Sequence, residues 1–527
     1  MKKGGTTVNI VPDANILRVR DFFYYAHLAE MYLLLRKLLG RKSVQGTLIY
    51  RREIKNMQKR VLRLYKKTVS IVNETPINMY EKLVGKKKGF LLESYDKNYD
   101  RYTFFGPEPE EIISSRGNSL VITKADGTEE VLEGNPCELL KEYYSSFEIR
   151  KDNQELAFTG GLVGNLGYDF VRYTETLPDD NPDTIGIETV QMMLMTHFVL
   201  VDHVAETLTA IVLEEDDDDG KARALALANE MITACRAAGS GPIRKNFHHD
   251  GKIIAQSDTL EQYSEKVEKI KHYIREGHVF QTVLSQRWTI ETGQEGFELY
   301  KELRELNPSP YLYYFNYGDF EVIGSSPEMI VKQQGDHVFT CPIAGTRPRG
   351  ADAQEDALLK DDLLQDEKER AEHVMLVDLA RNDMGRISEF GTVKVTRFME
   401  VQNYSHVMHI VSMVEGRKKG EFHPLDLVSS FLPAGTLSGA PKIRAMEIID
   451  ELETQRRGLY GGATGYIDFG GNMDFCITIR TMVKKGKNVY LQAGAGIVAD
   501  SVPENEYKEC CNKVMALAKT LVEEENL

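Results

Sequence analysis

The stretch "ATGYIDFGGNMDFCITIRTMVKKGKNVYLQAGAGIVA", residues 463–499, predicts three successive β-strands near the C-terminus. Apolar and β-branched residues fill its three segments, and Gly470-Gly471 and Lys485-Gly486 supply turn signals between them. Such short connections join antiparallel neighbours, so the tail predicts an antiparallel sheet. The middle segment is expected to be a single strand, and its alternation places Arg480 on the same face as Cys476 and Thr478.

Outward from this tail, the same strand-and-turn pattern recurs at residues 90–106, 119–131 and 191–215. Helices are expected at 221–238, 357–383 and 441–453, at the C-terminus from Glu504, and where Tyr263, Val267, Ile270 and Ile274 recur at helical spacing before Gly277. The segment "PIAGTRPRG", 342–350, has the pattern of a strand leading into an active-site turn. Together these segments predict a mixed α+β fold with a large antiparallel sheet.

Charge is unevenly distributed along the 527 residues. Residues 1–67 carry sixteen Lys and Arg against four Asp and Glu, whereas the whole chain has a net charge of −15. We therefore expect a basic N-terminal extension at 1–67, followed by regions at 68–240 and 255–527. The acidic body would repel nucleic-acid phosphates, which argues against a nucleic-acid partner.

The cysteine pattern and the hydropathy indicate the cellular compartment. Six cysteines form no CxxC pair, so neither a zinc site nor a disulfide framework is predicted. No apolar run approaches the roughly 18 residues of a membrane span, and the N-terminus lacks the apolar segment of a secretory signal. A cytoplasmic protein with no membrane partner is the expectation.

Two carboxylate pairs are candidates for metal binding. Glu369 and Glu372 lie three residues apart in one expected helix, and Glu506 and Glu509 do so in another. Each pair shares a helical face, and facing carboxylates suit Mg²⁺, which takes one or two of them together with water or substrate oxygens. Helical glutamates are usually just solvated, but the apolar run Val374–Val377 begins two residues after Glu372, which therefore needs a partner.

Other residues suggest an anion site with an acid–base group. His406 and His409 lie in the apolar segment 404–416, where an imidazole is either a core residue bonded to backbone or a general acid or base. The glycine-rich segments at 433–442 and 492–501 fit no nucleotide-binding pattern, but glycines allow backbone amides to approach an anion. With Arg480, Lys513 and a metal, they describe a site for a small dicarboxylate.

Ten segments, in this order, resemble the chorismate-utilising enzymes, and within them the large subunits of anthranilate synthase. They are "FLLES" (90–94), "NPSPYLYYF" (307–315), "SSPEMIV" (325–331), "PIAGTRPRG" (342–350), "ERAEHVMLVDLARND" (369–383), "YSHVMHIVS" (404–412), "PAGTLSGAPK" (433–442), "GLYGGATGY" (458–466), "FCITIRT" (475–481) and "GAGIVADSVPENEYKECCNK" (494–513). The resemblance implies large antiparallel sheets packed as a sandwich with helices outside, a regulatory and partner-contact region at 68–240 and a chorismate-binding catalytic domain at 255–527.

The resemblance also implies residue roles. Mg²⁺ would be held by Glu372 and Glu509 with support from Glu369 and Glu506; the substrate would be bound by Tyr460, Arg480, Gly494, Ala495, Gly496 and Lys513; and Thr436 would lie near the site of substitution. His409 would be the general acid or base, and His406 would be structural. Tryptophan would inhibit from a pocket formed by Glu93, Ser94, Pro310, Tyr311, Leu312 and Cys476.

Two positions point to the reaction by what they lack. The resemblance implies that aminodeoxychorismate synthases have a lysine where this chain has Ala344, and that this lysine attacks the substrate ring. Isochorismate and salicylate synthases have a lysine where this chain has Gln281, which activates water. Without either amine, ammonia itself would add to chorismate, giving anthranilate and pyruvate in tryptophan biosynthesis.

A partner is implied as well. The chain has no glutaminase nucleophile segment of the GxCxGxQ kind, so a separate glutamine amidotransferase subunit would supply the ammonia. The alternatives are an aminodeoxychorismate synthase component I, an aminodeoxyisochorismate synthase that stops at the intermediate, and a catalytically silent relative that only binds tryptophan or a partner.

Overall fold

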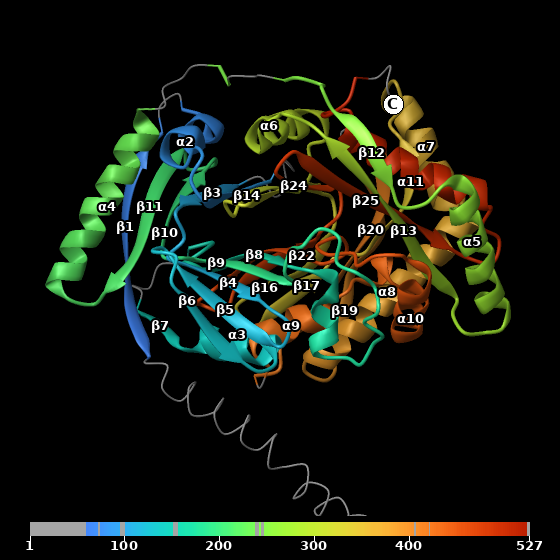
Figure 1. Cartoon of the computed structure of the whole chain (residues 1–527), viewed down its shortest axis with the longest axis horizontal. Helices are drawn as coiled ribbons and strands as arrows, with labels where there is room; N and C mark the ends of the chain where they lie inside the picture. Colours follow the sequence, from blue (N-terminus) through green and yellow to red (C-terminus); the bar gives the residue numbers. More distant parts are fainter. Residues whose placement is uncertain are drawn as a thin grey trace, which may run out of the picture.

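A computed structural model describes residues 59–71, 74–94, 101–150, 156–237, 242–243, 247–404, 407–420 and 422–523. Two large sheets lie face to face, with helices on their outer sides (Figure 1). The helices are α2 (Pro76–Leu83), α3 (Pro136–Ser145), α4 (Asp218–Arg236), α5 (Leu260–Arg275), α6 (Gly296–Leu306), α7 (Ala353–Gln365), α8 (Glu367–Ile387), α9 (Pro424–Phe431), α10 (Lys442–Leu452) and α11 (Pro503–Ala518), with short 3-10 turns η1 (Tyr168–Tyr173) and η2 (Gly435–Leu437).

The first sheet, as far as the chain is described, has 13 strands. Its order is β12 (Lys252–Gln256), β13 (Gln281–Glu291), β25 (Asn488–Ile497), β24 (Thr481–Lys485), β15 (Phe320–Ser326), β14 (Tyr311–Asn316), β2 (Gly89–Glu93), β3 (Tyr102–Pro107), β10 (His197–Asp202), β11 (Thr207–Glu215), β1 (Arg60–Ser70) and β7 (Phe147–Arg150), with β21 (Gly439–Ala440) beside β13. Its pairs are antiparallel except β1 with β7.

The second sheet has 12 strands within the described residues. Its order is β18 (Ile343–Pro348), β20 (Val407–Arg417), β17 (His337–Thr340), β16 (Met329–Gln334), β23 (Met473–Ile477), β22 (Ala463–Asp468), β8 (Gly161–Leu166), β9 (Val190–Met195), β4 (Glu111–Ser115), β5 (Ser119–Lys124) and β6 (Glu129–Glu133), with β19 (Lys394–Asn403) beside β20. The expected antiparallel strands and the α+β sandwich are confirmed.

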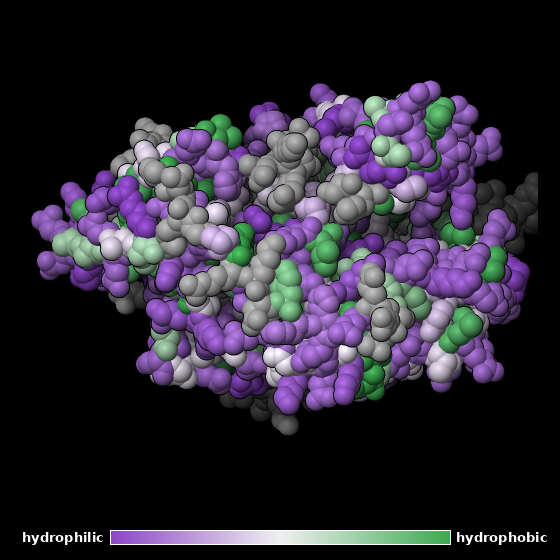
Figure 2. Space-filling view, turned by 90° about the horizontal axis from the view of Figure 1, so that it is seen from above, coloured by the Kyte–Doolittle hydropathy of each residue, from purple (hydrophilic) through white to green (hydrophobic). Residues whose placement is uncertain are grey.

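The core has three layers because each sheet is covered on both faces. Between the sheets, Phe90 and Phe198 of the first sheet share a buried cluster with Val163 and Met193 of the second. The outer face of the first sheet packs against α2, α4, α5, α6, α10 and α11, and the outer face of the second packs against α3, α8 and α9. Figure 2 shows a mostly hydrophilic surface with scattered hydrophobic side chains, as expected of a chain whose apolar faces are covered.

The two main regions expected from the sequence share both sheets. Strand β2 pairs with β14, and β8 pairs with β22, so the N-terminal and C-terminal parts continue each sheet through one another. The expected boundary at 67 lies inside β1, which pairs with β11, and the boundary at 255 lies inside β12. Residues 1–58 lie outside the described part of the chain. No helix in the described ranges is both long and apolar enough to cross a membrane.

Three local expectations were wrong. The helix expected at 357–383 is two helices, because the Asp366 side chain caps α8 by accepting from the amides of Lys368 and Glu369. The segment "PIAGTRPRG" is not a turn but strand β18, with a bulge at Gly345 (φ +66°). Residues 473–483 are not one strand, as the site geometry shows below.

Candidate active site

A cavity of about 240 Å³ lies where α8, α11, β25 and β20 meet, and we call it the catalytic cavity. It brings together most of the site residues predicted from the sequence: Gln281, Ala344, Glu372, His409, Thr436, Tyr460, Arg480, Gly494, Gly496, Glu509 and Lys513. These residues come from nine separate segments of the chain. Their convergence identifies this cavity as the candidate active site.

Arg480 lies at a break between the two sheets. Strand β23 ends at Ile477 in the second sheet and β24 begins at Thr481 in the first, and Arg480 between them has φ +51°. The expected shared face with Cys476 and Thr478 is therefore wrong, because Arg480 faces the catalytic cavity whereas Cys476 lines a different one. Burial lowers the pKa of the guanidinium, which makes no hydrogen bond or ion pair with any described residue. A partly buried cation left unpaired in this way indicates an anionic ligand.

Glu372 is an unpaired charge of opposite sign. It lines the catalytic cavity from α8 and makes no hydrogen bond or ion pair within the described residues. Its pKa is raised by burial and by the nearby charges of Glu369 and Glu509. Across the cavity, Glu509 on α11 pairs with the Lys513 ammonium at 2.6 Å, and that ammonium also donates to the Gly494 carbonyl at 2.8 Å.

Glu369 and Glu506 stand at the edge of this group. The Glu369 carboxylate lies beside Gly345 and 3.8 Å from the Arg347 guanidinium; burial raises its pKa, with Glu509 among the contributing charges. Burial, with a contribution from Glu509, likewise raises the pKa of Glu506. The negative charges of four carboxylates, from two helices, thus repel one another.

This donor set fits Mg²⁺ together with an oxygen-bearing substrate. In the described chain no three His, Cys, Asp or Glu side chains converge as a complete metal site. Mg²⁺ is usually held by only one or two carboxylates, with the remaining positions filled by water or substrate. Glu372, whose carboxylate is unpaired, and Glu509, which lines the same cavity, supply the two carboxylates.

His409 is positioned by the bulged strand β18. Its Nδ1–H donates to the Gly345 carbonyl at 2.8 Å, so in the neutral ring Nε2 carries the free lone pair. Burial lowers its pKa, which keeps the ring neutral near pH 7. The ring packs edge to face against Tyr404, with 5.3 Å between centroids. Ala344, next to Gly345, lines the same cavity, whereas His406 lies outside the described residues.

Strand β25 forms a cavity wall that requires glycine. A Cβ on Gly496 would meet the Gln281 amide at 2.4 Å, and one on Gly494 would meet the Tyr460 hydroxyl at 3.0 Å. Ala495, between them, points to the other face of the strand and is buried in the core under the helices, so its side chain does not reach the cavity. The wall presents backbone rather than side chains to a ligand.

Sequence reasoning missed Glu328. It lines the catalytic cavity, its Oε1 accepts from the Thr436 hydroxyl at 3.0 Å, and burial raises its pKa to about 7. A carboxyl group that is partly protonated at neutral pH is a candidate general acid. The signal was present in "SSPEMIV", where Glu328 stands between Pro327 and Met329 in an apolar context.

A second cavity of about 330 Å³, which we call the neighbouring cavity, shares Pro327 and Ile343 with the first. All six residues expected to bind an inhibitor line it: Glu93, Ser94, Pro310, Tyr311, Leu312 and Cys476. Glu93 is held from behind, because it accepts from the Tyr300 hydroxyl at 2.6 Å and from Arg304 at 2.8 Å.

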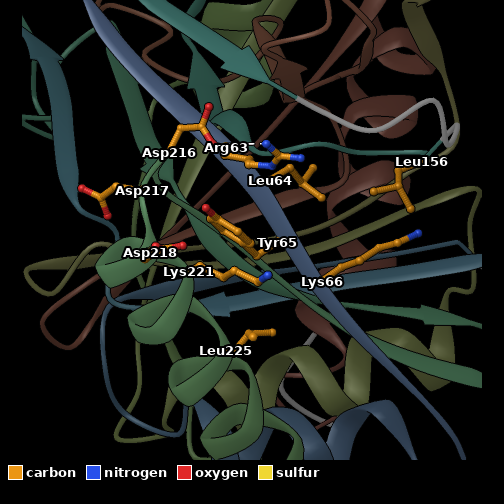
Figure 3. A pocket seen from close by; sticks show the side chains of 10 residues that line it. All are labelled: Arg63, Leu64, Tyr65, Lys66, Leu156, Asp216, Asp217, Asp218, Lys221 and Leu225. Atoms are coloured by element: carbon orange, nitrogen blue, oxygen red, sulfur yellow. Dashed lines mark hydrogen bonds and ion pairs between the residues drawn. The ribbon is translucent and has the colours of Figure 1, made fainter.

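A larger groove of about 590 Å³ lies elsewhere, between β1 and the start of α4 (Figure 3). Arg63 and Asp216 point toward one another there and pair at 3.2 Å, and Arg150 also pairs with Asp216 at 2.6 Å. None of the predicted site residues lies in it. Size alone therefore does not identify the active site.

Comparison with known proteins identifies the family. The model of the chorismate binding enzymes matches residues 90–519. An anthranilate synthase component 1 from Acetivibrio thermocellus is 45% identical over 85% of this chain and 93% of its own length, and one from Pseudomonas putida is 43% identical over 85% and 93%. The crystal structure of anthranilate synthase component I from Streptococcus pneumoniae superposes with a TM-score of 0.70 at 36% identity, covering 85% of this chain and 99% of that one. A menaquinone-specific isochorismate synthase from Escherichia coli, at 16% identity over 90% of this chain and 99% of its own, shares the fold with a TM-score of 0.65. This chain belongs to the chorismate binding enzyme family.

Proposed function

We propose that this chain is an anthranilate synthase component I, which converts chorismate and ammonia to anthranilate and pyruvate. The observation that carries the proposal is a cavity with unpaired charges of both signs, Arg480 and Glu372, and no free amine at Ala344 or Gln281. Lys513 does line the cavity, but it is engaged by Glu509 and the Gly494 carbonyl. The nucleophile must therefore come from outside the protein.

Different residues of the catalytic cavity would bind the two carboxylates of the substrate. Arg480 and the backbone of Gly494 and Gly496 face the space where a carboxylate would be held. Glu372 and Glu509 would hold Mg²⁺, whose role would be to neutralise and orient the second carboxylate of the substrate. Tyr460 closes one wall over Gly494.

The chemistry follows from the two titratable groups. Ammonia forms a bond to C2 of the ring, both ring double bonds move by one position, and the C4–O bond breaks with a proton from Glu328, so that water leaves; the ammonium group formed at C2 then returns a proton to the Glu328 carboxylate. In the second step the proton on C2 is removed, the C3–O bond breaks, and the departing enolpyruvyl group takes up a proton at its methylene carbon to become pyruvate, which leaves the aromatic amine. Neutral His409, with its free Nε2, supports the role of base in this proton transfer.

Relatives named component 1 support the proposal of a separate glutamine amidotransferase partner as the ammonia source. Feedback inhibition by tryptophan is proposed on the convergence of the six expected residues in the neighbouring cavity. We further propose that the enzyme is Mg²⁺-dependent and works in the cytoplasm.

The test is product identification. Purified chain with chorismate, Mg²⁺ and excess ammonium chloride should form anthranilate, detected by fluorescence and mass, and should stop when EDTA is added. Formation of a 4-amino product, of an aminodeoxyisochorismate that accumulates, or no loss of chorismate would contradict the proposal. Each of those outcomes corresponds to one of the alternative functions considered from the sequence.

A further inference from the structure

A small third cavity adjoins the catalytic cavity along α8, and we call it the side cavity. Its volume of about 40 Å³ suits one to three molecules of the size of water. It shares Glu328, Leu376 and Thr436 with the catalytic cavity, so the two spaces adjoin at these three residues. The rest of its lining is mostly apolar: Met329, Ile330, Pro342, Leu379, Ala380, Phe431, Ala434, Gly435 and Ile477, with Thr340 and Asp383 as polar exceptions.

Asp383 has an unmet hydrogen-bonding requirement in this cavity. The residue is only 4% exposed, and its Oδ2 accepts from the Lys442 ammonium at 3.0 Å. Its Oδ1, in contrast, is buried without a partner in the described part of the chain. A buried carboxylate oxygen left without a donor is unfavourable, so a small donor such as a cation or water is expected beside it.

The side cavity leads away from the catalytic cavity. Leu376, which lines both, and Asp383 lie seven residues apart on α8, which corresponds to roughly 10 Å along a helix. Leu379 and Ala380, between them, are partly exposed, so this wall approaches the protein surface. The space therefore extends from beside Glu328 toward the outer side of α8.

The catalytic cavity has another opening for its larger substrate. An open hollow of about 450 Å³ on the outer face of α11 shares Arg480, Glu509 and Lys513 with it and adds Lys508. A dicarboxylate that enters through this hollow and binds at Arg480 blocks the hollow for any molecule that follows it. A small nucleophile that arrives second needs a different path.

We propose that the side cavity holds the nitrogen nucleophile, received as ammonium at Asp383 and delivered as ammonia beside Glu328 and Thr436. The inference rests on the proposed function and extends it to the route of the second substrate. Ammonium gives one proton to the Asp383 carboxylate, ammonia moves along the apolar wall, and the carboxyl releases the proton to solvent. Apolar walls favour neutral ammonia over the ion, because an unpaired charge there is costly.

The kinetic test uses two variants on α8. Asp383→Asn keeps the shape and still accepts from Lys442, and Ala380→Leu fills part of the side cavity. In both, the apparent KM for ammonium chloride at saturating chorismate should rise about five-fold or more, while the KM for chorismate stays within about two-fold. The matched control is Ala371→Leu, at an exposed position of the same helix, which should change neither constant.

An ammonium KM that stays within about two-fold in both variants, or a chorismate KM that rises in parallel, would overturn the inference. A second readout is independent of activity: crystals soaked in thallous ion, an ammonium mimic, should show an anomalous peak beside Asp383 Oδ1 that is absent in Asp383→Asn. No such peak in the unaltered protein also counts against it. Failure of the unaltered chain to make anthranilate would contradict the proposed function, and the ion peak would still decide the site.

Discussion

The catalytic cavity and the neighbouring cavity share the wall of Pro327 and Ile343 but treat charge in opposite ways. In the catalytic cavity, Arg480 and Glu372 make no ion pair with the described residues. In the neighbouring cavity, Lys332 pairs with Asp474 at 2.8 Å. Unpaired charges that are partly buried lower stability and are retained where a ligand completes them, whereas a charge that already has an ion-pair partner can serve the scaffold.

Two further pairs of the neighbouring cavity extend this contrast. Arg101 pairs with Asp202 at 3.0 Å and Arg304 with Glu93 at 2.8 Å, and the remaining lining is largely aromatic and aliphatic. Such a space suits a ligand with a large apolar body and few polar groups. The two cavities should therefore respond differently to the loss of one charge.

The largest effect is expected from Arg480→Met. If the guanidinium binds a substrate carboxylate, its loss should lower kcat/KM about 1000-fold or more, near 4 kcal/mol. The melting temperature should not fall, because no ion pair is broken in the free protein. Arg101→Met, at the rim of the neighbouring cavity, is the matched control and should leave kcat/KM within about two-fold. Steady-state kinetics with ammonium measure kcat/KM for both variants. A similarly small loss of kcat/KM in both would refute the contrast between the two cavities.

Glu372→Gln should lower activity and raise stability. The pKa of Glu372 is raised, so its ionised form destabilises the free protein at neutral pH, and removal of the charge relieves this. We expect kcat/KM to fall about 100-fold, with a weaker response to Mg²⁺, and the melting temperature without Mg²⁺ to rise by about 1–2 °C. Calorimetry with and without Mg²⁺ measures the second effect. A lower melting temperature in the variant would show that Glu372 has a stabilising partner.

The pH dependence separates the roles of two residues in the catalytic cavity. If protonated Glu328 is the acid, kcat/KM for chorismate at constant free ammonia should decline as pH rises through about 7, its pKa in the folded protein. If neutral His409 is the base, the rate should decline on the acid side only below the ordinary histidine range, because its pKa is lowered. Glu328→Gln should abolish the alkaline decline along with most of the activity. An unchanged alkaline limb in that variant would assign the limb to another group.

Ser94→Phe tests the neighbouring cavity. A phenyl ring at the edge of a 330 Å³ space should exclude an aromatic ligand, so inhibition by tryptophan should weaken about ten-fold or more. Activity without tryptophan should stay within about two-fold, because Ser94 does not line the catalytic cavity. Inhibition curves at fixed chorismate give both values. Full inhibition in the variant would place the effector elsewhere.

Local sequence patterns predicted the helices and strands better than they predicted which strands pair with one another. Alternation and turn residues gave strands β5 and β6 and helices α4 and α5, because those signals act over a few neighbouring residues. The pairing of β2 with β14 joins residues more than 200 apart, and no local rule specifies it. The break at Arg480 was hidden because the residues around it, FCITIRTMV at 475–483, are apolar or β-branched apart from Arg480 itself.

The catalytic site shows the same limit. Arg480, Glu372 and His409 could be proposed from residue type and resemblance, but only the fold shows that Arg480 and Glu372 lack partners. Glu328 was missed because a single glutamate beside proline carries no periodic signal, and its raised pKa comes from burial by distant segments. Burial of charge is a tertiary property, and the sequence pattern does not encode it locally.

The smallest effect is expected from Leu312→Met in the neighbouring cavity. Leu312 is 1% exposed and packs in the core under the helices, and its neighbour across the sheet is Glu93, so its side chain supports the cavity wall from the helix side without bearing charge. A swap of nearly equal volume should cost less than about 1.5 kcal/mol and leave the tryptophan concentration for half-inhibition within about three-fold. Leu312→Ala, which empties the same space, should instead cost about 2–5 kcal/mol of stability. If Leu312→Met alone abolished inhibition, ligand binding would depend on the exact shape of the cavity wall. The description of this cavity as an apolar space of suitable volume, with its charges paired, would then be wrong.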